Sequence, residues 1–339
     1  MSNFKVNKVV AFLFLGVFLI LFPFVVGDYI LHLGIMAIIN ILLAVSIGLV
    51  LGYLGELSFG HAIFYGIGAY FSAYVTMNYG WPFWISMPIA IIVTMIIGFF
   101  VAFISFRTKG HYFALVTMGI GQIFFILANN LEHVTGGGAG IRGIQPPESI
   151  NLGFMQINFE VREVMYYFIL LIAILAIWFV YQVIVSKYGR SFVAVREDQL
   201  LSEFVGLHSM RLKLTNFTLS AGVAGLAGVL SAHFILFVSP DFLSLTQSMN
   251  MLLMVILGGM GTIVGPIIGG VLLTVLMEVL NVVGEYKMIV YGAILIILIL
   301  FLPKGIYGTL KHRKYNAVKM PSKNIKKPSE NDELIKNSI

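Results

Sequence analysis

The sequence predicts an all-α polytopic membrane protein with about ten transmembrane helices. Of its 339 residues, 59% are hydrophobic and only 11% are charged, and the mean hydropathy is +0.96. Soluble domains carry about 25% charged residues, so this composition excludes a soluble globular fold. Several uncharged runs are also long enough to cross a bilayer, which takes roughly 20 apolar residues in a helix.

Turn residues divide the apolar runs into spans. Gly80-Trp81-Pro82 interrupts the longest run, and the stretch Gly258–Pro266 interrupts a later one. The first run, Val9–Val26, is longer than the roughly 7–15 apolar residues of a secretory signal and lacks a cleavage pattern, so we interpret it as a span. The expected spans are 9–27, 30–51, 57–78, 83–106, 111–130, 164–186, 214–237, 249–264, 266–283 and 288–302.

Basic residues predict the orientation of these spans, because cytoplasmic segments of membrane proteins are enriched in Lys and Arg. One set of alternating segments holds 18 of the 21 basic residues, and the other set keeps only Arg142, Arg162 and Lys287. Both termini are therefore expected in the cytoplasm. The net charge of +6 reflects this topology and is no sign of nucleic-acid binding. The segments expected on the cytoplasmic side, which together hold the 18 basic residues, are 1–8, 52–56, 107–110, 186–213 and 304–339.

The chain divides into a transmembrane domain, 1–310, and a polar tail, 311–339. The tail has too few apolar residues to pack, so we expect it to be disordered or to face lipid headgroups. Within the domain, the one sizeable outer loop is 132–163. Its glycine-rich part, Thr135–Gly140, either contacts a substrate-delivery protein or serves as a simple linker.

Glycine-rich turns form an approximate internal repeat. GYLG at Gly52 and LGGMG near Gly258 each lie between two spans and are each followed by further glycines. Paired interruptions in two halves are typical of a translocation path, although close packing of helices by small residues explains them equally well. His61 within a span is either functional or hydrogen-bonded in the bundle. The predicted path residues are Gly55, Glu56, Ser58, Gly60, His61, Gly258, Gly261 and Gly265.

The segment 186–213 is the one long polar stretch between two apolar spans. It contains an amphipathic pattern, preceded by Glu197 and Asp198 at the positive end of a short helix and closed by Gly206 at the C′ position. From the residues alone, this helix either enters a groove on a partner protein or lies on the bilayer surface. The apolar face consists of Leu200, Leu201, Phe204, Val205 and Leu207.

Catalytic and nucleotide-binding motifs are missing from the sequence. The dipeptide Gly-Lys does not occur, so there is no P-loop, and any ATP must be hydrolysed by a separate subunit. The seven His are scattered and there is no Cys, so we expect neither a metal site nor an enzyme. This chain is expected to bind no cofactor.

Six blocks in order along most of the chain resemble the LivM-type permease of branched-chain amino acid ABC importers. The resemblance implies a type II importer-like bundle in a prokaryotic inner (plasma) membrane. It also implies a homologous LivH-type permease, two ATP-binding subunits that hold ATP and Mg²⁺, and an extracytoplasmic substrate-binding protein. The blocks are GYLGELSFGHAIFYGIGAY, LANNLEHVTGGGAGIRGI, GRSFVAVREDQLLSEFVGL, SAGVAGLAGVLSAHFILFVSPD, LLMVILGGMGTIVGPIIGG and LPKGIYG.

The resemblance favours the docking interpretation of the polar segment, because the block Gly189–Leu207 is similar to the family's coupling loop. One departure is Glu56, where many relatives carry Gln, and this carboxylate either alters the substrate preference or caps a turn. Related importers on this scaffold carry urea or short amides, which are the alternative substrates. An ion-coupled carrier that works alone is the alternative from another class. The predicted ATPase-coupling residues are Arg196, Glu197, Asp198, Leu201, Phe204 and Gly206.

Overall fold

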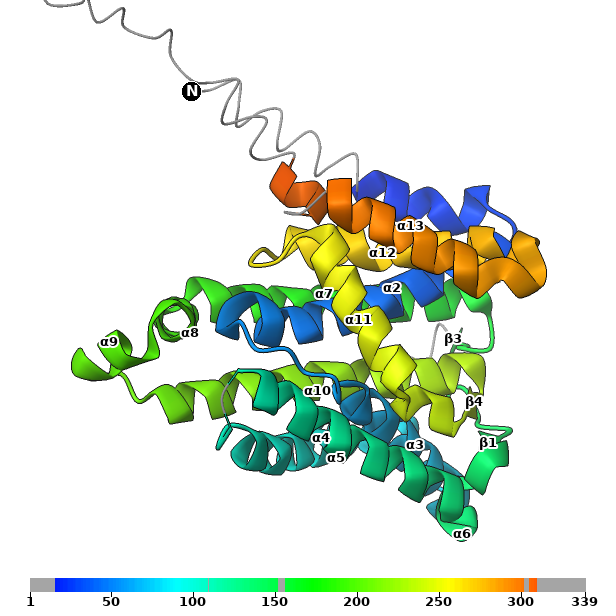
Figure 1. Cartoon of the computed structure of the whole chain (residues 1–339). Helices are drawn as coiled ribbons and strands as arrows, with labels where there is room; N and C mark the ends of the chain where they lie inside the picture. The colour runs from blue at the N-terminus through cyan, green and yellow to red at the C-terminus, as the bar shows by residue number, and fades with distance from the viewer. Residues whose placement is uncertain (1–15, 109, 152–155, 302–304, 310–339) are drawn as a thin grey trace, which may run out of the picture.

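The computed structural model describes residues 16–108, 110–151, 156–301 and 305–309. A short apolar helix, Gly16–Val25, precedes the first labelled element. Figure 1 shows the labelled helices, most of which lie side by side in one bundle. They are α2 (Asp28–Gly48), α3 (Ala62–Tyr79), α4 (Phe83–Ser105), α5 (His111–Asn130), α6 (Glu132–Thr135), α7 (Arg162–Val185), α8 (Lys187–Glu197), α9 (Gln199–Phe204), α10 (Ser209–Ile235), α11 (Leu245–Gly258), α12 (Val264–Val279) and α13 (Lys287–Phe301).

Other local structures complete the described chain. A π-helix, η1 (Leu49–Leu54), extends α2, and 3₁₀ turns follow at η2 (Gly137–Ala139), η3 (Pro240–Leu243) and η4 (Leu280–Tyr286). Four strands of two residues each add to the predicted all-α fold. They pair antiparallel, β1 (Ile141–Arg142) with β4 (Phe237–Val238), and β2 (Ile150–Asn151) with β3 (Gln156–Ile157).

Six described helices are long and apolar enough to cross a membrane, and they support a multi-pass membrane protein. Two of them, α10 and the continuous helix Asp28–Leu54, form the centre of the bundle. In each, 72% of the residues in an 18-residue apolar stretch are buried. The helices α4, α5 and α7 have only 22–28% buried and surround that centre. Apolar side chains on these outer helices face lipid or another membrane subunit, because no water-soluble fold exposes so many.

The two central helices run antiparallel, and three contacts fix their register. Lys213 at the start of α10 pairs with Glu56, just beyond the end of the α2 helix. Near the middle, the Ser220 hydroxyl donates to the Ser46 carbonyl at 2.5 Å. At the far end, the rings of His32 and Phe234 lie 4.9 Å apart. One end of the bundle carries α8 and α9 and is called the α9 end here. The opposite end carries loop 132–163 and is called the loop end (Figure 1).

The helices α3 and α10 approach each other with glycine at the contact. A Cβ on Gly68 would lie 2.2 Å from the Gly225 carbonyl oxygen, and a Cβ on Gly228 would lie 2.0 Å from the Tyr65 carbonyl oxygen. Both distances are far inside van der Waals contact, so only glycine allows the two backbones to touch. This part of the predicted glycine pattern serves close helix packing.

The predicted span 57–78 is wrong at its start, because the helix begins at Ala62. Gly55 ends the preceding helix in the left-handed conformation, with φ 73°. Residues 56–61 then turn back into the bundle, where Gly60 packs against the Thr117 carbonyl of α5.

The matching connection after α10 begins at Leu236, also left-handed with φ 61°. The predicted first span is described only from residue 16, and the tail 311–339 lies outside the described residues.

Candidate functional site

The helix α9 is a short, well-capped element at the α9 end. The Asp198 carboxylate accepts a hydrogen bond from the Leu201 N–H at 3.0 Å and caps the first turn. At the other end, the N–H groups of Gly206 and Leu207 donate to the carbonyls of Glu203 and Ser202, both at 3.0 Å. With Gly206 at φ 87°, this is a complete Schellman motif, and the sequence predicted both caps.

The apolar face of α9 is open to the surroundings. Phe204 is 85% exposed and Val205 is 76% exposed, and Leu200 and Leu201 are also exposed. Figure 1 shows α9 at the edge of the bundle, beyond α8. Large apolar side chains that stay exposed on a rigid, capped helix are typical of a surface that binds another protein or a membrane.

Arg196, at the end of α8, connects this helix to both predicted glycine turns. Its guanidinium donates to the Gly52 carbonyl at 2.7 Å and to the Glu197 carboxylate at 2.5 Å. A Cβ on Gly55 would lie 2.8 Å from the Arg196 Cγ, and a Cβ on Gly261 would lie 3.6 Å from its guanidinium nitrogen. The predicted coupling set and part of the predicted path set therefore meet at one side chain.

Lys213 makes a second tie to the same turn. Its ammonium donates to the Glu56 carboxylate at 2.7 Å, and both side chains are only 14% exposed. The Phe106 ring lies 5.5 Å from the ammonium and completes a partly buried cation site. We call Arg196 and Lys213, with the turn 52–56 that they hold, the inner clamp. The two cations flank α9 in the sequence, and each binds one end of the same turn.

The sequence missed Lys213 and gave Glu56 no partner. A signal was present, because Glu56 and Lys213 both fall in segments predicted for one side of the membrane. Their separation of 157 residues carries no information about contact, so the pairing becomes visible only in three dimensions. The Gly52 carbonyl was also missed, because backbone groups leave no mark in a residue pattern.

Other predicted path residues lie deeper in the bundle. His61 and Ser58 are fully buried. The His61 Nε2 lies 3.1 Å from the Ser46 Oγ and 3.0 Å from the Ser220 Oγ. Both hydroxyls already donate to carbonyls, so Nε2 carries the proton that bridges them. His61 is thus hydrogen-bonded in the bundle, one of the two alternatives open from the sequence.

The turn between α11 and α12 contains the remaining predicted path residues. A Cβ on Gly258 would lie 1.9 Å from the Gly265 carbonyl oxygen, and a Cβ on Gly265 would lie 2.1 Å from the Gly259 carbonyl oxygen. These glycines allow the two helices to join through a very close turn. Gly261, with φ 72°, points the turn toward Arg196. Their role in transport stays a prediction.

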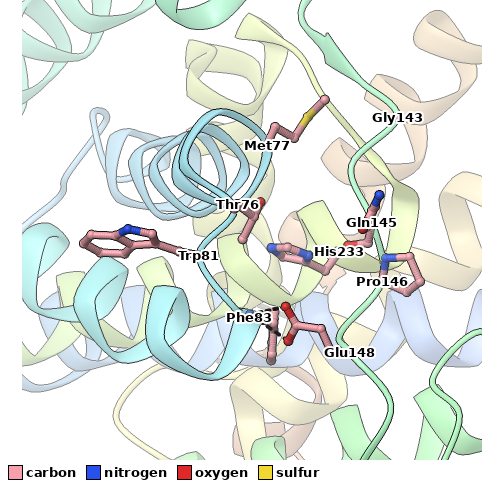
Figure 2. Close-up of a pocket in the computed structure, with 10 residues that line it drawn as sticks. Thr76, Met77, Trp81, Phe83, Gly143, Gln145, Pro146, Glu148 and His233 are labelled. Atoms are coloured by element: carbon pink, nitrogen blue, oxygen red, sulfur yellow. Dashed lines mark hydrogen bonds between the residues drawn. The ribbon is translucent and has the colours of Figure 1, made fainter.

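At the loop end, His233 ties loop 132–163 to the bundle. Its Nδ1 lies 2.7 Å from the Gln145 carbonyl and therefore donates to it, while Nε2 lies 2.9 Å from the Ser72 hydroxyl. The Glu148 carboxylate accepts from the Phe83 N–H at 3.0 Å, at the start of α4. Figure 2 shows His233, Gln145, Phe83 and Glu148 among the residues that line a cavity of about 320 Å³.

Comparisons with known proteins give the chain its family. Residues 29–299 match the family model described as branched-chain amino acid transport system / permease component. The high-affinity branched-chain amino acid transport system permease protein LivM of Salmonella typhimurium is 34% identical over 302 residues, which cover 84% of this chain and 71% of the relative. LivM of Escherichia coli is 34% identical over 315 residues, covering 87% of this chain and 74% of the relative.

The permease protein LivH of Escherichia coli is also similar, with 26% identity over 288 residues, 79% of this chain and 90% of the relative. No solved structure matches the chain. The family match covers most of the described bundle, including the inner clamp, α9 and the turn between α11 and α12. The chain therefore belongs to the family of branched-chain amino acid transport system permease components, on its LivM-type branch.

Proposed function

We propose that this chain is the membrane-spanning permease subunit of an ATP-binding-cassette importer for branched-chain, hydrophobic amino acids. The names of its LivM and LivH relatives support this substrate class. The observation that carries the importer mechanism is α9, a capped helix with an exposed apolar face, held at both flanks by cations bound to the membrane domain. Because the sequence has no P-loop, ATP and Mg²⁺ belong to separate subunits.

The apolar face of α9 is the proposed docking surface for one of two cytoplasmic ATPase subunits. Leu201 and Phe204 supply the contact, and Asp198 and Gly206 fix the helix that presents them. A lipid-facing role is less suited to this geometry, because α9 stands clear of the bundle where a partner can surround it (Figure 1). Glu197 positions the Arg196 guanidinium at the base of the helix.

Movement of α9 passes to the membrane domain through the inner clamp in this proposal. Arg196 lies three residues before Gln199, the first residue of α9, and binds the Gly52 carbonyl, so an ATPase that displaces α9 also pulls on the turn 52–56. The turn around Gly261 lies against the same guanidinium. One arginine thus reaches both glycine turns predicted for the path, including Gly55 and Gly261, and couples their positions to the ATPase.

The proposed topology has ten crossings, with both termini on the cytoplasmic side of the prokaryotic inner (plasma) membrane. The segments 52–56 and 186–213, both predicted to be cytoplasmic, lie together at the α9 end. The predicted outer segments lie together at the loop end, where Arg162 is 3.9 Å from Asp28. An internal repeat between the glycine turns at Gly52 and Gly258 is part of this proposal. A different likeness supports a repeat, since 28–79 and 209–258 each contain a 27-residue helix, a left-handed residue and a shorter helix.

A LivH-type permease is the proposed partner in the membrane, and an extracytoplasmic binding protein delivers substrate to loop 132–163. The exposed apolar surfaces of α4, α5 and α7 leave room for a second membrane subunit beside the bundle. The His233 contact fixes the loop on the bundle and so offers the binding protein a defined surface.

Reconstitution tests this function. The chain, its LivH-type partner, the two ATPases and the binding protein are placed in liposomes, and uptake of leucine, isoleucine and valine is measured with and without ATP. ATP-dependent uptake of these amino acids, exceeding that of urea, is the expected result. Uptake by this chain alone without ATP indicates a secondary carrier instead, and ATP-dependent uptake of urea but none of the amino acids assigns the chain to a different importer.

A further inference from the structure

A polar cleft crosses the outer half of the bundle between α2, α11 and α12. It has a volume of about 260 Å³, near the lower end of the roughly 300–1,000 Å³ found for small-molecule sites. It starts at the loop end, where the Tyr29 hydroxyl donates to Glu278. Its polar lining comes from His32, Asn40, Gln247, Asn250, Thr274 and Glu278.

The cleft reaches far into the membrane-spanning region. Asn40 follows Asp28 by twelve residues on a continuous helix of 27 residues, so it lies about 18 Å along a helix of about 40 Å. Polar side chains at such depth are rare and mark substrate paths or water-filled cavities, because burial in hydrocarbon is costly. None of the predicted path residues lines this cleft, so it is a separate feature of the bundle.

Hydrogen bonds orient the two asparagines in opposite senses. The Asn40 Nδ2 donates to the Thr274 Oγ1 at 2.9 Å, and the Thr274 hydroxyl in turn donates a hydrogen bond to the Gly270 carbonyl. Asn250 accepts at Oδ1 from the Tyr291 hydroxyl at 3.2 Å. Within the described residues, this leaves the acceptor oxygen of Asn40 and the donor nitrogen of Asn250 for a ligand. One asparagine thus offers an acceptor and the other a donor.

The remaining wall of the cleft is aliphatic. Met36, Met254 and Met277 line it together with two leucines. Methionine side chains are flexible and polarizable, so such a wall accepts branched aliphatic groups of somewhat different shape. An ammonium group matches Asn40 Oδ1, a carboxylate matches Asn250 Nδ2, and a branched side chain matches the methionines.

We propose that this cleft binds the zwitterion of a branched-chain amino acid on its way from the loop end into the membrane. The inference rests on the proposed function and names the site that recognises the substrate. Asn40 and Asn250 are the specificity-determining residues, one for each charged group of the amino acid. The binding protein selects the amino acid first, and the cleft receives it.

Thiol labelling tests the site, because the chain contains no Cys and any introduced thiol is the only one in this subunit. Asn40→Cys and Asn250→Cys are prepared in the full complex in liposomes and exposed to a charged methanethiosulfonate reagent from the binding-protein side. We expect both to be labelled and to be protected at least tenfold when leucine-loaded binding protein is present. The control is Ile92→Cys, at a position on α4 that is 55% exposed on the outside of the bundle, and it is expected to stay unlabelled.

Uptake gives an independent readout. Asn40→Leu and Asn250→Leu keep the side-chain size and are expected to raise the KM for leucine uptake at least tenfold while the ATPases still copurify. The matched control is Asn78→Leu, an exposed amide at the end of α3 outside the cleft, which is expected to keep the wild-type KM.

The proposal is overturned when the wild-type complex takes up leucine but neither cysteine is labelled, when labelling is not reduced by substrate, or when both leucine variants keep the wild-type KM. A wild-type complex that takes up no branched-chain amino acid overturns the proposed function instead. The labelling of Asn40→Cys then still reports whether the cleft contains water.

Discussion

The two connections that follow the central helices, 55–61 and 236–244, begin with the same backbone conformation but are held by different contacts. Each begins with a left-handed residue, Gly55 or Leu236, after a 27-residue helix. The first is held by the inner clamp, with two hydrogen bonds of 2.7 Å to the segment around α9. The second is held by the β1–β4 ladder, which pairs Phe237 with Arg142 of the loop. The first connection is thus held at the α9 end, and the second is held at the loop end.

The first turns of α3, which follow the first connection, touch the second connection and the start of α11. The Ala62 N–H donates to the Ser248 hydroxyl at 2.9 Å, and the rings of Tyr65 and Phe242 stack with centroids 4.7 Å apart. A displacement of the first connection therefore meets the second directly. An ATPase docked at the α9 end, as proposed, would therefore have a short route to the loop end of the bundle.

The largest effect is expected when the α9 surface itself is changed. Leu201→Asp with Phe204→Asp places two charges on a face where both side chains are more than 60% exposed, so the fold is retained while the apolar contact is lost. We expect copurification of the ATPase subunits to fall at least tenfold, because central apolar residues dominate interface energy. The control is Val282→Asp, which is 90% exposed on η4 and distant from α9 in the sequence. If the wild type, the double variant and the Val282→Asp control copurify the ATPase subunits equally well, α9 is not the docking helix.

The second prediction separates docking from transmission. Arg196→Ala removes the hydrogen bond to Gly52 but leaves the apolar face of α9 in place. We expect the complex to assemble and hydrolyse ATP, while leucine uptake per ATP falls about tenfold, the effect of losing roughly 1.4 kcal/mol of coupling. Arg196→Lys recovers part of the uptake. Arg190→Ala on the same helix α8 is the control, since the Arg190 guanidinium donates to the nearby Val185 carbonyl at the end of α7 and not to the turn 52–56. Wild-type coupling in Arg196→Ala contradicts the role of the inner clamp.

The third prediction concerns stability at the other half of the clamp. Lys213→Met leaves the Glu56 carboxylate without its partner in a site that is 14% exposed. We expect the free energy of unfolding to fall by about 2 kcal/mol, less than the 3–5 kcal/mol seen for fully buried pairs. The double variant Glu56→Gln with Lys213→Met is expected to recover most of it. Thermal unfolding of the detergent-solubilised protein measures both, and additive losses in the double variant would show that the two residues are not coupled.

The smallest effect distinguishes the two left-handed residues. Leu236→Gly relieves the strain of a left-handed non-glycine residue and costs some chain entropy, so we expect a change within about 1 kcal/mol. Gly55→Leu introduces that strain and also places a side chain on Arg196, whose Cγ is only 2.8 Å from the new Cβ. We expect it to lower the unfolding free energy by at least about 2 kcal/mol. Equal thermal midpoints would mean that both connections tolerate the same residues.

The sequence was informative where local chemistry decides structure. The caps of α9 at Asp198 and Gly206 were predicted because each acts within one helical turn. The start of α3 was missed because Leu57 and Phe59 look like helix residues, while the contact of Gly60 with Thr117 is made across the bundle. The ion pair of Glu56 and the asparagines of the cleft were equally hidden, since each depends on residues from separate helices.

The contact between α3 and α10 has a mechanical consequence. Two helices whose backbones touch at Gly68 and Gly225 have no side chain between them at that point that could rearrange. They are expected to move together as one rigid body, so opening and closing of the permease must come from other pairs of helices. The α11–α12 unit is suited to be the moving part, because its turn at Gly258–Gly265 lies beside Arg196 and its helices form two walls of the polar cleft. A movement of α11 and α12 would therefore open the cleft and shift the turn at Gly258–Gly265 at the same time.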